Sequence, residues 1–203
     1  MRTGGHGRLG DRALLFRPGL IVGPHDPTQR FTYWPARVAR AVERQAVLVP
    51  GAVDHAVQFI DVRDVAAFLL RAIDDGRGGA LNVVSAPLAL TMGDVLEACV
   101  LVAGTRPRWH WASAEQIERW GLKPWIELPL WLSSASEHAA FACTDTRAAQ
   151  AAGLAIRPIA QTVADTLAWY RRLPSDQQAF TKAGLSPERE ALALAQISAT
   201  AGA

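Results

Sequence analysis

Short, mainly apolar runs bounded by turn residues are the feature that most restricts the fold of this chain. Ala13–Phe16 is closed by Arg17-Pro18-Gly19, and Leu20–Val22 continues it to Gly23-Pro24. A second run covers Leu81–Val84, in which Asn82 is the one polar residue. Apolar runs of this length without polar alternation are typical of strands buried inside a parallel sheet. We therefore expect Ala13–Phe16 and Leu81–Val84 to be internal strands.

Helical patterns alternate with the strands. Trp34, Val38, Ala41 and Val42 share one face of a helix predicted over 32–44. A helix over 61–74 is predicted with Asp61 as its N-cap, and its apolar stripe consists of Val65, Phe68, Leu69 and Ile73. Further helices are predicted over 92–103, from Ser113, from Thr146, over 158–173 and from Ser186, and further strands over 46–49, 57–60 and 108–111. The pattern predicts an α/β protein with more helix than strand.

Composition excludes several classes of function. The 203 residues carry a formal net charge of +2 with no concentrated basic stripe, so we expect no nucleic-acid partner. No apolar run approaches the about 20 residues of a membrane span, and Met1–Gly7 lacks the apolar core of a signal peptide. The five histidines and two cysteines, Cys99 and Cys143, show no metal-ligand spacing. A cytoplasmic protein without a metal site is predicted.

Four segments carry a family resemblance through their order. They are Leu15–Pro24, Gln58–Ala66, Ala80–Ser85 followed by Thr91, and Ala152-Gly153-Leu154 followed by the helical Thr166–Tyr170. Over about residues 13–172, the chain resembles the carboxy-terminal portion of the extended short-chain dehydrogenase/reductases, also named the NAD-dependent epimerase/dehydratase family. The resemblance implies NAD or NADP as cofactor. It also implies the last strands of a Rossmann-type parallel sheet plus a small, mainly helical substrate-binding domain.

The same resemblance suggests a division of the chain and a set of site residues. We predict a disordered start over 1–12, the family portion over 13–173 and a helical tail over 174–203. The resemblance places four residues beside the nicotinamide: Pro18, Gly19, Leu20 and Ile21. It places six residues at the substrate pocket: Gly23, Pro24, His25, Phe31, Trp34 and Phe59. For the aromatic residues, ordinary core packing is an open alternative.

No catalytic residue is predicted. In the family, a Tyr exchanges a proton with the substrate, and a Lys four residues later lowers the pKa of that Tyr. Tyr33 is followed at this spacing by Arg37, and Tyr170 by Pro174. Thr3–Gly10 reads Thr-Gly-x-x-Gly-x-x-Gly, yet no strand can precede it and an apolar strand rather than a helix follows it. Asp61 and Asp64 are interpreted as helix-capping residues rather than acid–base catalysts.

Two functional hypotheses follow. The first is the substrate-binding half of an NAD(P)-dependent oxidoreductase or epimerase-like enzyme acting on a carbonyl or alcohol, truncated and inactive alone. The second is a non-catalytic module for small-ligand binding or oligomerisation. As macromolecular partner we expect either a second copy of this chain, giving a homodimer, or a separate amino-terminal half. Val57 occupies a position where nucleotide-sugar members often carry an Arg that contacts the diphosphate. The valine at this position favours an apolar or uncharged substrate, and so do five tryptophans. These are Trp109, Trp111, Trp120, Trp125 and Trp131.

Overall fold

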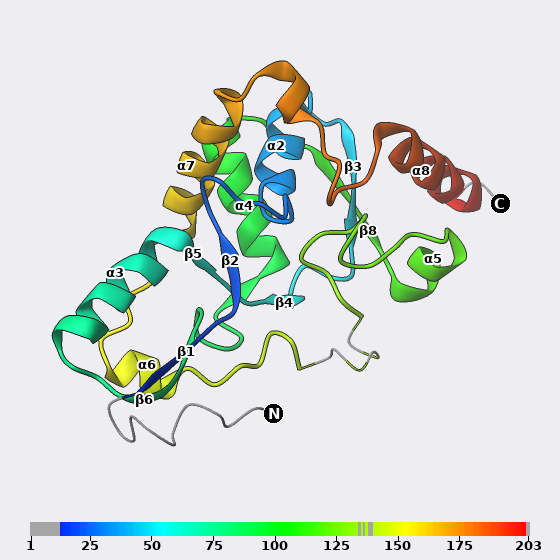
Figure 1. Cartoon of the computed structure of the whole chain (residues 1–203). Coiled ribbons are helices and arrows are strands. Elements are labelled where there is room, and N and C mark those ends of the chain that lie inside the picture. The colour runs from blue at the N-terminus through cyan, green and yellow to red at the C-terminus, as the bar shows by residue number, and fades with distance from the viewer. Residues whose placement is uncertain (1–12, 134, 136, 138–139, 202–203) are drawn as a thin grey trace.

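The computed structural model describes residues 13–133, 135, 137 and 140–201, and it shows short strands alternating with helices (Figure 1). The α/β class predicted from the sequence is confirmed. The strands are β1 Leu14–Pro18, β2 Leu20–Val22, β3 Ala46–Pro50, β4 Ala56–Val57, β5 Phe59–Asp61, β6 Gly79–Val83, β7 Leu90–Thr91 and β8 Arg108–Ala112. The helices are α2 Tyr33–Ala39, α3 Val62–Asp74, α4 Met92–Ala103, α5 Ala114–Arg119, α6 Arg147–Ala151, α7 Ile159–Arg171 and α8 Pro187–Ala201, with the short 3-10 helix η2 Ser175–Gln178.

Parallel strand pairs form the framework. β1 pairs with β6, β2 with β5 and β3 with β8, all in parallel, whereas the short β4 and β7 are antiparallel. The β1–β6 register aligns Pro18 with Val83, so the carboxyl ends of both strands lie at the same edge. Ligands of open α/β sheets bind outside the carboxyl ends of the strands, which directs attention to this edge.

Gly19 allows β1 to turn into β2 directly against β6. A Cβ atom on Gly19 would lie 2.6 Å from Cγ2 of Val84, closer than packed carbon atoms approach. The amide of Gly19 donates to the carbonyl of Val83 at 3.2 Å, which holds the turn in place. The Arg-Pro-Gly sequence therefore has a packing reason that does not depend on any ligand.

A large cluster of buried apolar side chains involves α2, α4 and α7, whose ribbons lie in the upper part of Figure 1. Its centre is α4, which packs against α2 and α7, and α8 closes it against β3. The sequence defines α4 at both ends: Thr91 and Asp94 form a reciprocal capping box, and Gly104 takes the left-handed conformation after the last turn. The predicted bounds of this helix are confirmed.

A small cluster lies under α3 and α6, beside β1 and β6. Its buried members are Ile60, Phe68, Leu81, Val83, Ala149 and Ala152. Phe68 of α3 meets Phe16 of β1 with ring centroids 6.1 Å apart. The prediction that Ala13–Phe16 is an internal strand is wrong for the described structure: β1 has β6 as its one strand partner there, and Leu14–Phe16 are half-buried.

Two predicted helices differ in detail. α2 ends at Ala39 rather than Arg44, and Val42 is exposed, because the chain turns at Arg44 (φ 60°) to enter β3. α3 begins after the Asp61 cap as predicted, but its buried face is Asp64, Phe68 and Ala72. Ile73, expected in the apolar stripe, is exposed.

Within the part of the chain that the structure describes, no helix has the length and apolar character needed to cross a membrane. Over the same residues, no group of three or more His, Cys, Asp or Glu side chains is arranged to hold a metal ion. The predicted disordered start over 1–12 lies outside the described residues.

Candidate functional site

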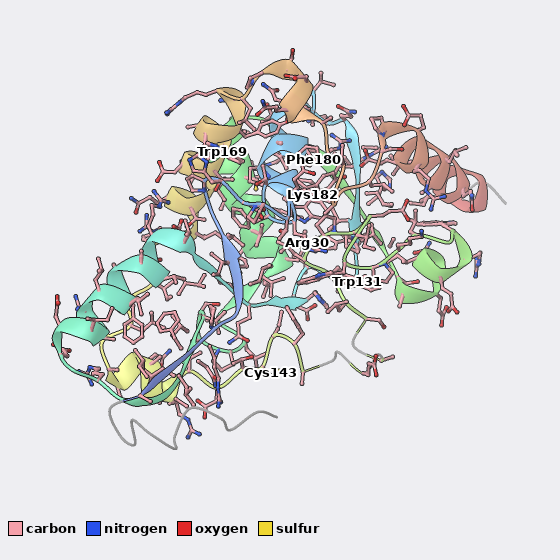
Figure 2. The ribbon with its side chains drawn as sticks, viewed as in Figure 1. Arg30, Trp131, Cys143, Trp169, Phe180 and Lys182 are labelled. Atoms are coloured by element: carbon pink, nitrogen blue, oxygen red, sulfur yellow. The ribbon has the colours of Figure 1, made fainter. Side chains whose placement is uncertain are left out.

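A pocket of about 160 Å³ opens at the carboxyl edge of β1 and β6. Leu20 reaches it just after the Gly19 turn, Phe59 comes from the start of β5, and Leu88 from the loop after β6. The remaining walls belong to the segment before β5 and to two later loops. The full lining is Leu20, His55, Ala56, Val57, Gln58, Phe59, Leu88, Trp125, Leu130, Leu132, Phe141, Ala142 and Cys143. Cys143 lies below Trp131 in Figure 2.

Three of the wall residues have a backbone conformation that bulky side chains rarely adopt. Leu88, Trp125 and Leu130 have φ values of 58°, 66° and 66°. The left-handed region is unfavourable for such residues by about 1–3 kcal/mol each, and strain of this kind concentrates at functional sites. The surrounding structure therefore holds the apolar wall in a conformation that these residues would not choose locally.

Gln58 fixes the loop that carries Phe141 and Cys143. Its amide nitrogen donates to the carbonyl of Ser85 at 2.7 Å and to that of Thr144 at 2.8 Å, and its amide oxygen accepts from the Thr144 amide at 2.9 Å. The side chain is buried, and both donor hydrogens are used. Gln58 thus shapes the pocket and has little left to offer a ligand.

His55 is the polar side chain of the pocket with unused hydrogen-bonding capacity. Its imidazole makes no hydrogen bond to another described residue, and its ring lies 6.2 Å from that of Trp131. Burial lowers the pKa of His55, against a smaller opposing effect of Asp54. Because the ordinary pKa is 6.5, the imidazole is neutral at pH 7 and offers one donor and one acceptor.

The four residues predicted beside the nicotinamide form the bend between β1 and β2. Pro18 and Gly19 are exposed at the strand end, and Leu20 lines the pocket. Ile21 instead packs against the small cluster. Of the four, Leu20 lines the pocket, Pro18 and Gly19 precede it in the exposed bend, and Ile21 turns away.

The predicted substrate residues are divided between the loop after β2 and the core. Gly23 has φ 112°, and Pro24 follows it in the same turn. His25 is exposed and packs on Trp169, with ring centroids 5.2 Å apart. Of the six predicted substrate residues, Phe59 alone lines the pocket.

Phe31 and Trp34 are fully buried in the large cluster. The ring of Phe31 lies 5.1 Å behind that of Phe59, and the indole nitrogen of Trp34 donates to the carbonyl of Pro129 at 2.9 Å. For these two residues the packing alternative describes the structure. Both residues support the pocket wall from behind. Phe31 packs behind Phe59, and Trp34 holds Pro129, the neighbour of the wall residue Leu130.

The tryptophan-rich second half contributes one ring to the site. Trp125 lines the pocket, whereas Trp131 is buried, and Trp109, Trp111 and Trp120 pack against the large cluster. Of the five tryptophans that favoured an apolar substrate, Trp125 is therefore the one that can contact a ligand in this pocket. Its ring lies 4.8 Å from that of Phe141 and 5.2 Å from the guanidinium of Arg30.

Neither tyrosine is suited to proton transfer in this site. Burial and the nearby Glu190 carboxylate raise the pKa of Tyr33, the opposite of what a catalytic phenol needs. Arg37, four residues later, pairs with Glu190 at 2.8 Å. The hydroxyl of Tyr170 donates to the carbonyl of Gln178 at 2.6 Å.

Asp61 and Asp64 have structural partners. Asp61 caps α3 through the Arg63 amide at 2.9 Å and also accepts from the Arg63 guanidinium. Burial raises the pKa of Asp61, but hydrogen bonds from Arg63 and Thr162 outweigh it and hold the pKa below its ordinary value. Asp64 accepts from the amide and guanidinium of Arg157. These contacts fit the capping interpretation.

Residues 6–84 match the model of the NAD dependent epimerase/dehydratase family. The resemblance predicted from the sequence is confirmed. A comparison with curated proteins found no match. The match to this family includes β1, the Gly19 bend, α3 and β6, and thus the Leu20, Phe59 and Val57 walls of the pocket.

Solved structures share the fold of this chain. UDP-glucose 4-epimerase from Thermus thermophilus, in complex with NAD, superposes with a TM-score of 0.51 and 20% identity, over 79% of this chain and 47% of that one. A GDP-L-fucose synthetase from Naegleria fowleri superposes with a TM-score of 0.54 and 12% identity, over 82% of this chain and 47% of that one. The chain spans about half the length of these proteins.

Sequence reasoning missed most of the pocket wall. His55, Leu88, Leu130, Leu132, Phe141 and Cys143 belong to no recognisable motif. The aromatic and proline-rich stretch around Trp125 was the available signal, because turn residues beside apolar ones often mark irregular walls. Phe141 and Cys143 reach the site through Gln58, more than 80 residues away in the chain, and no local pattern encodes that contact.

Proposed function

We propose that this chain forms the substrate-binding portion of an NAD(P)-dependent oxidoreductase or epimerase-like enzyme that acts on a carbonyl or alcohol. The observation that carries the proposal is the apolar pocket at the carboxyl ends of β1 and β6, next to the Gly19 bend. This is where open α/β sheets bind ligands. A fold relative that shares this framework has been solved with NAD. We also propose a cytoplasmic location.

The exposed bend at Pro18 and Gly19 suits contact with a flat nicotinamide ring. Pro18 and Gly19 are exposed, so a ring can approach the bend from the solvent side, and Leu20 provides an apolar wall next to it. A bound nicotinamide supplies hydride chemistry. The residues of this chain exclude water from the pocket, orient the substrate between apolar walls and, through His55, offer it a neutral hydrogen-bonding group.

The 203 residues contain no Tyr-x-x-x-Lys sequence, and the proposal therefore assigns the proton-transfer pair of the family to another polypeptide segment. We therefore expect the purified chain to bind ligand without turning it over. The test is absorbance of NADH and NADPH at a fixed wavelength with a panel of aldehydes, ketones and alcohols. No substrate-dependent oxidation is expected, and ligand-observed NMR on the same panel should show binding that Phe141→Ala weakens.

Oxidation of either cofactor that depends on substrate, and that a change in this chain abolishes, would contradict the inactive-alone part of the proposal. Loss of the binding signal for every carbonyl and alcohol would contradict the substrate-binding part. Leu192→Ala, which shortens an exposed side chain on α8 away from the pocket, is the matched control for Phe141→Ala.

A non-catalytic ligand-binding or oligomerisation module is the second candidate. It is favoured by the large cluster, which helices of this chain enclose from α2 to α8. Sedimentation and thermal unfolding discriminate the two. A monodisperse chain with one cooperative unfolding transition supports the free-standing ligand-binding or oligomerisation module. Aggregation through the exposed edge of β1 supports the alternative, in which the chain is the substrate-binding portion of a larger enzyme.

A further inference from the structure

We propose that the pocket at the carboxyl edge of β1 and β6 is selective for an uncharged ligand with a single aromatic ring and one alcohol or carbonyl group. The inference rests on the proposed function for the role of the site. It goes further by naming the class of ligand. Its grounds are the volume, the charge and the ring geometry of the pocket.

Volume limits the ligand to about one ring. The pocket measures about 160 Å³, and an engineered apolar cavity of roughly 150 Å³ is known to hold benzene. A nucleoside diphosphate sugar has several times the number of atoms of benzene and cannot be enclosed in this space. The open side of the pocket leaves room for a short polar substituent.

Among the residues that the structure describes, the pocket wall contains no charged side chain. None of its lining residues is Asp, Glu, Lys or Arg. Val57, at the position of the expected anion-binding arginine, is buried and apolar. The nearby Arg30 is outside the wall, where its Nε donates to the carbonyl of Trp125 at 3.1 Å. A carboxylate or diphosphate entering the pocket would lose water without gaining an ionic partner.

Aromatic rings form the part of the wall that favours an aromatic ligand over an aliphatic one. Trp125 and Phe141 meet edge to face, with an interplanar angle of 73° and centroids 4.8 Å apart. Phe59 provides a third ring, which Phe31 supports from behind. Edge-to-face and offset contacts add about 0.5–1.5 kcal/mol per pair beyond burial, so an added ring is favoured here.

His55 supplies the polar contact. Its neutral imidazole lines the pocket and makes no hydrogen bond to another described residue. The imidazole can donate to a carbonyl oxygen in one tautomer and accept from a hydroxyl in the other. Gln58, the other strongly polar wall residue, has both donor hydrogens occupied by Ser85 and Thr144. One alcohol or carbonyl group in the ligand is therefore matched by His55.

The test compares four ligands on the purified chain by NMR titration: benzyl alcohol, cyclohexylmethanol, benzoate and UDP-glucose. We expect benzyl alcohol to bind about fivefold more tightly than cyclohexylmethanol, given the contribution of ring pairs. Benzoate and UDP-glucose should show no saturation. The ratio between the first two ligands measures the aromatic walls, because their size and hydroxyl group are matched.

Two variants locate the effect. Phe141→Ala removes a ring that is 44% exposed, so the fold should tolerate it. It should reduce the preference for benzyl alcohol over cyclohexylmethanol to about twofold or less, since one ring pair is lost. Leu192→Ala on α8 is 65% exposed and should leave the preference unchanged. His55→Leu should weaken both alcohols equally, because each uses the same hydroxyl.

Equal binding of the two alcohols, tighter binding of benzoate or UDP-glucose, or a preference that survives Phe141→Ala would each overturn the inference. If aliphatic carbonyls bind in a Phe141-dependent manner while aromatic ligands do not, the inference fails and the proposed function stands. If no carbonyl or alcohol binds, both fail.

Discussion

The large cluster around α4 is enclosed by helices from near the start and near the end of the chain, whereas the small cluster around β1 and β6 is only partly covered. Helices α2, α7 and α8 all contribute to the first. In the second, Leu14 and Phe16 of β1 remain half-buried, and the pair of strands has no third strand among the described residues. The helices and strands of this chain therefore enclose the large cluster more fully than the small one.

This difference has a physical basis in the kind of element that each region uses. A helix satisfies its own backbone and needs a partner for one face alone, so a few helices can close a core. A parallel strand needs neighbours on both edges and cover on both faces. The helical region can therefore be stable within this chain, while β1 and β6 gain from further strands. The pocket shares Leu20, Phe59 and Leu130 with the large cluster.

The largest expected effect concerns α8, which the sequence presents as a tail. Glu190 of α8 is buried and accepts from the Leu48 amide at 3.0 Å and from Nε of Arg37 at 2.9 Å. Glu190→Ala leaves Arg37 and the Leu48 amide without this partner. We expect a loss of about 3–5 kcal/mol in the free energy of unfolding, because breaking a buried ion pair leaves an uncompensated charge.

Urea unfolding followed by circular dichroism measures this loss. Glu188→Ala is the control, since Glu188 lies on the same helix and is exposed, and it should cost less than about 1 kcal/mol. Equal effects of the two changes would mean that α8 does not close the large cluster. The contrast between the two regions would then lose its main support.

The next prediction compares the same substitution in both regions. Leu96 of α4 is fully buried in the large cluster, and Leu14 of β1 is half-buried beside the small one. Leu96→Ala should cost about 3 kcal/mol, within the range for deleting a buried leucine. Leu14→Ala should cost about 1 kcal/mol or less, because less area leaves the core.

Urea midpoints of the two variants, measured under one set of conditions, provide the comparison. A Leu14→Ala effect as large as that of Leu96→Ala would show that β1 is better covered than the described residues suggest. The division into a closed region and an open one would then need revision.

The sequence predicted elements whose signals are local. α4 is correct at both ends because Thr91 and Gly104 act on adjacent backbone groups. The pairing of β3 with β8 could not be read from the sequence, because register depends on contacts between Val47 and Trp109 that are far apart in the chain. Thus, the elements were more predictable than their arrangement.

The candidate site was predictable in part for the same reason. Leu20 and Phe59 lie in motifs and do line the pocket. Phe31 and Trp34 carry the same apolar signal but are buried in the core, since hydrophobicity alone does not separate a pocket wall from the packing behind it. Phe141 joins the site through the long-range bonds of Gln58 to Thr144.

The smallest expected effect lies at the junction of the two regions, where Asp61 ends β5 and caps α3. Asp61→Asn keeps an acceptor for the Arg63 amide, so the cap survives, but it removes the charge that pairs with the Arg63 guanidinium. We expect a loss of about 1 kcal/mol at pH 7, because the two arginines that pair with the buried Asp61, Arg63 and Arg157, keep Asp165 and Asp64 as ion-pair partners. The pKa of Asp61 is lowered in the folded state. Its contribution is therefore present above the ordinary pKa of 3.8 and is lost as the pH falls through the lower folded value. The difference in unfolding free energy between the two proteins should shrink as the pH falls from 7 to 3, because the unfolded wild-type carboxylate takes up a proton near pH 3.8, above the lowered pKa of the folded state. A constant difference across this range would show that Asp61 acts through packing rather than charge, and that the junction is held together as the large cluster is.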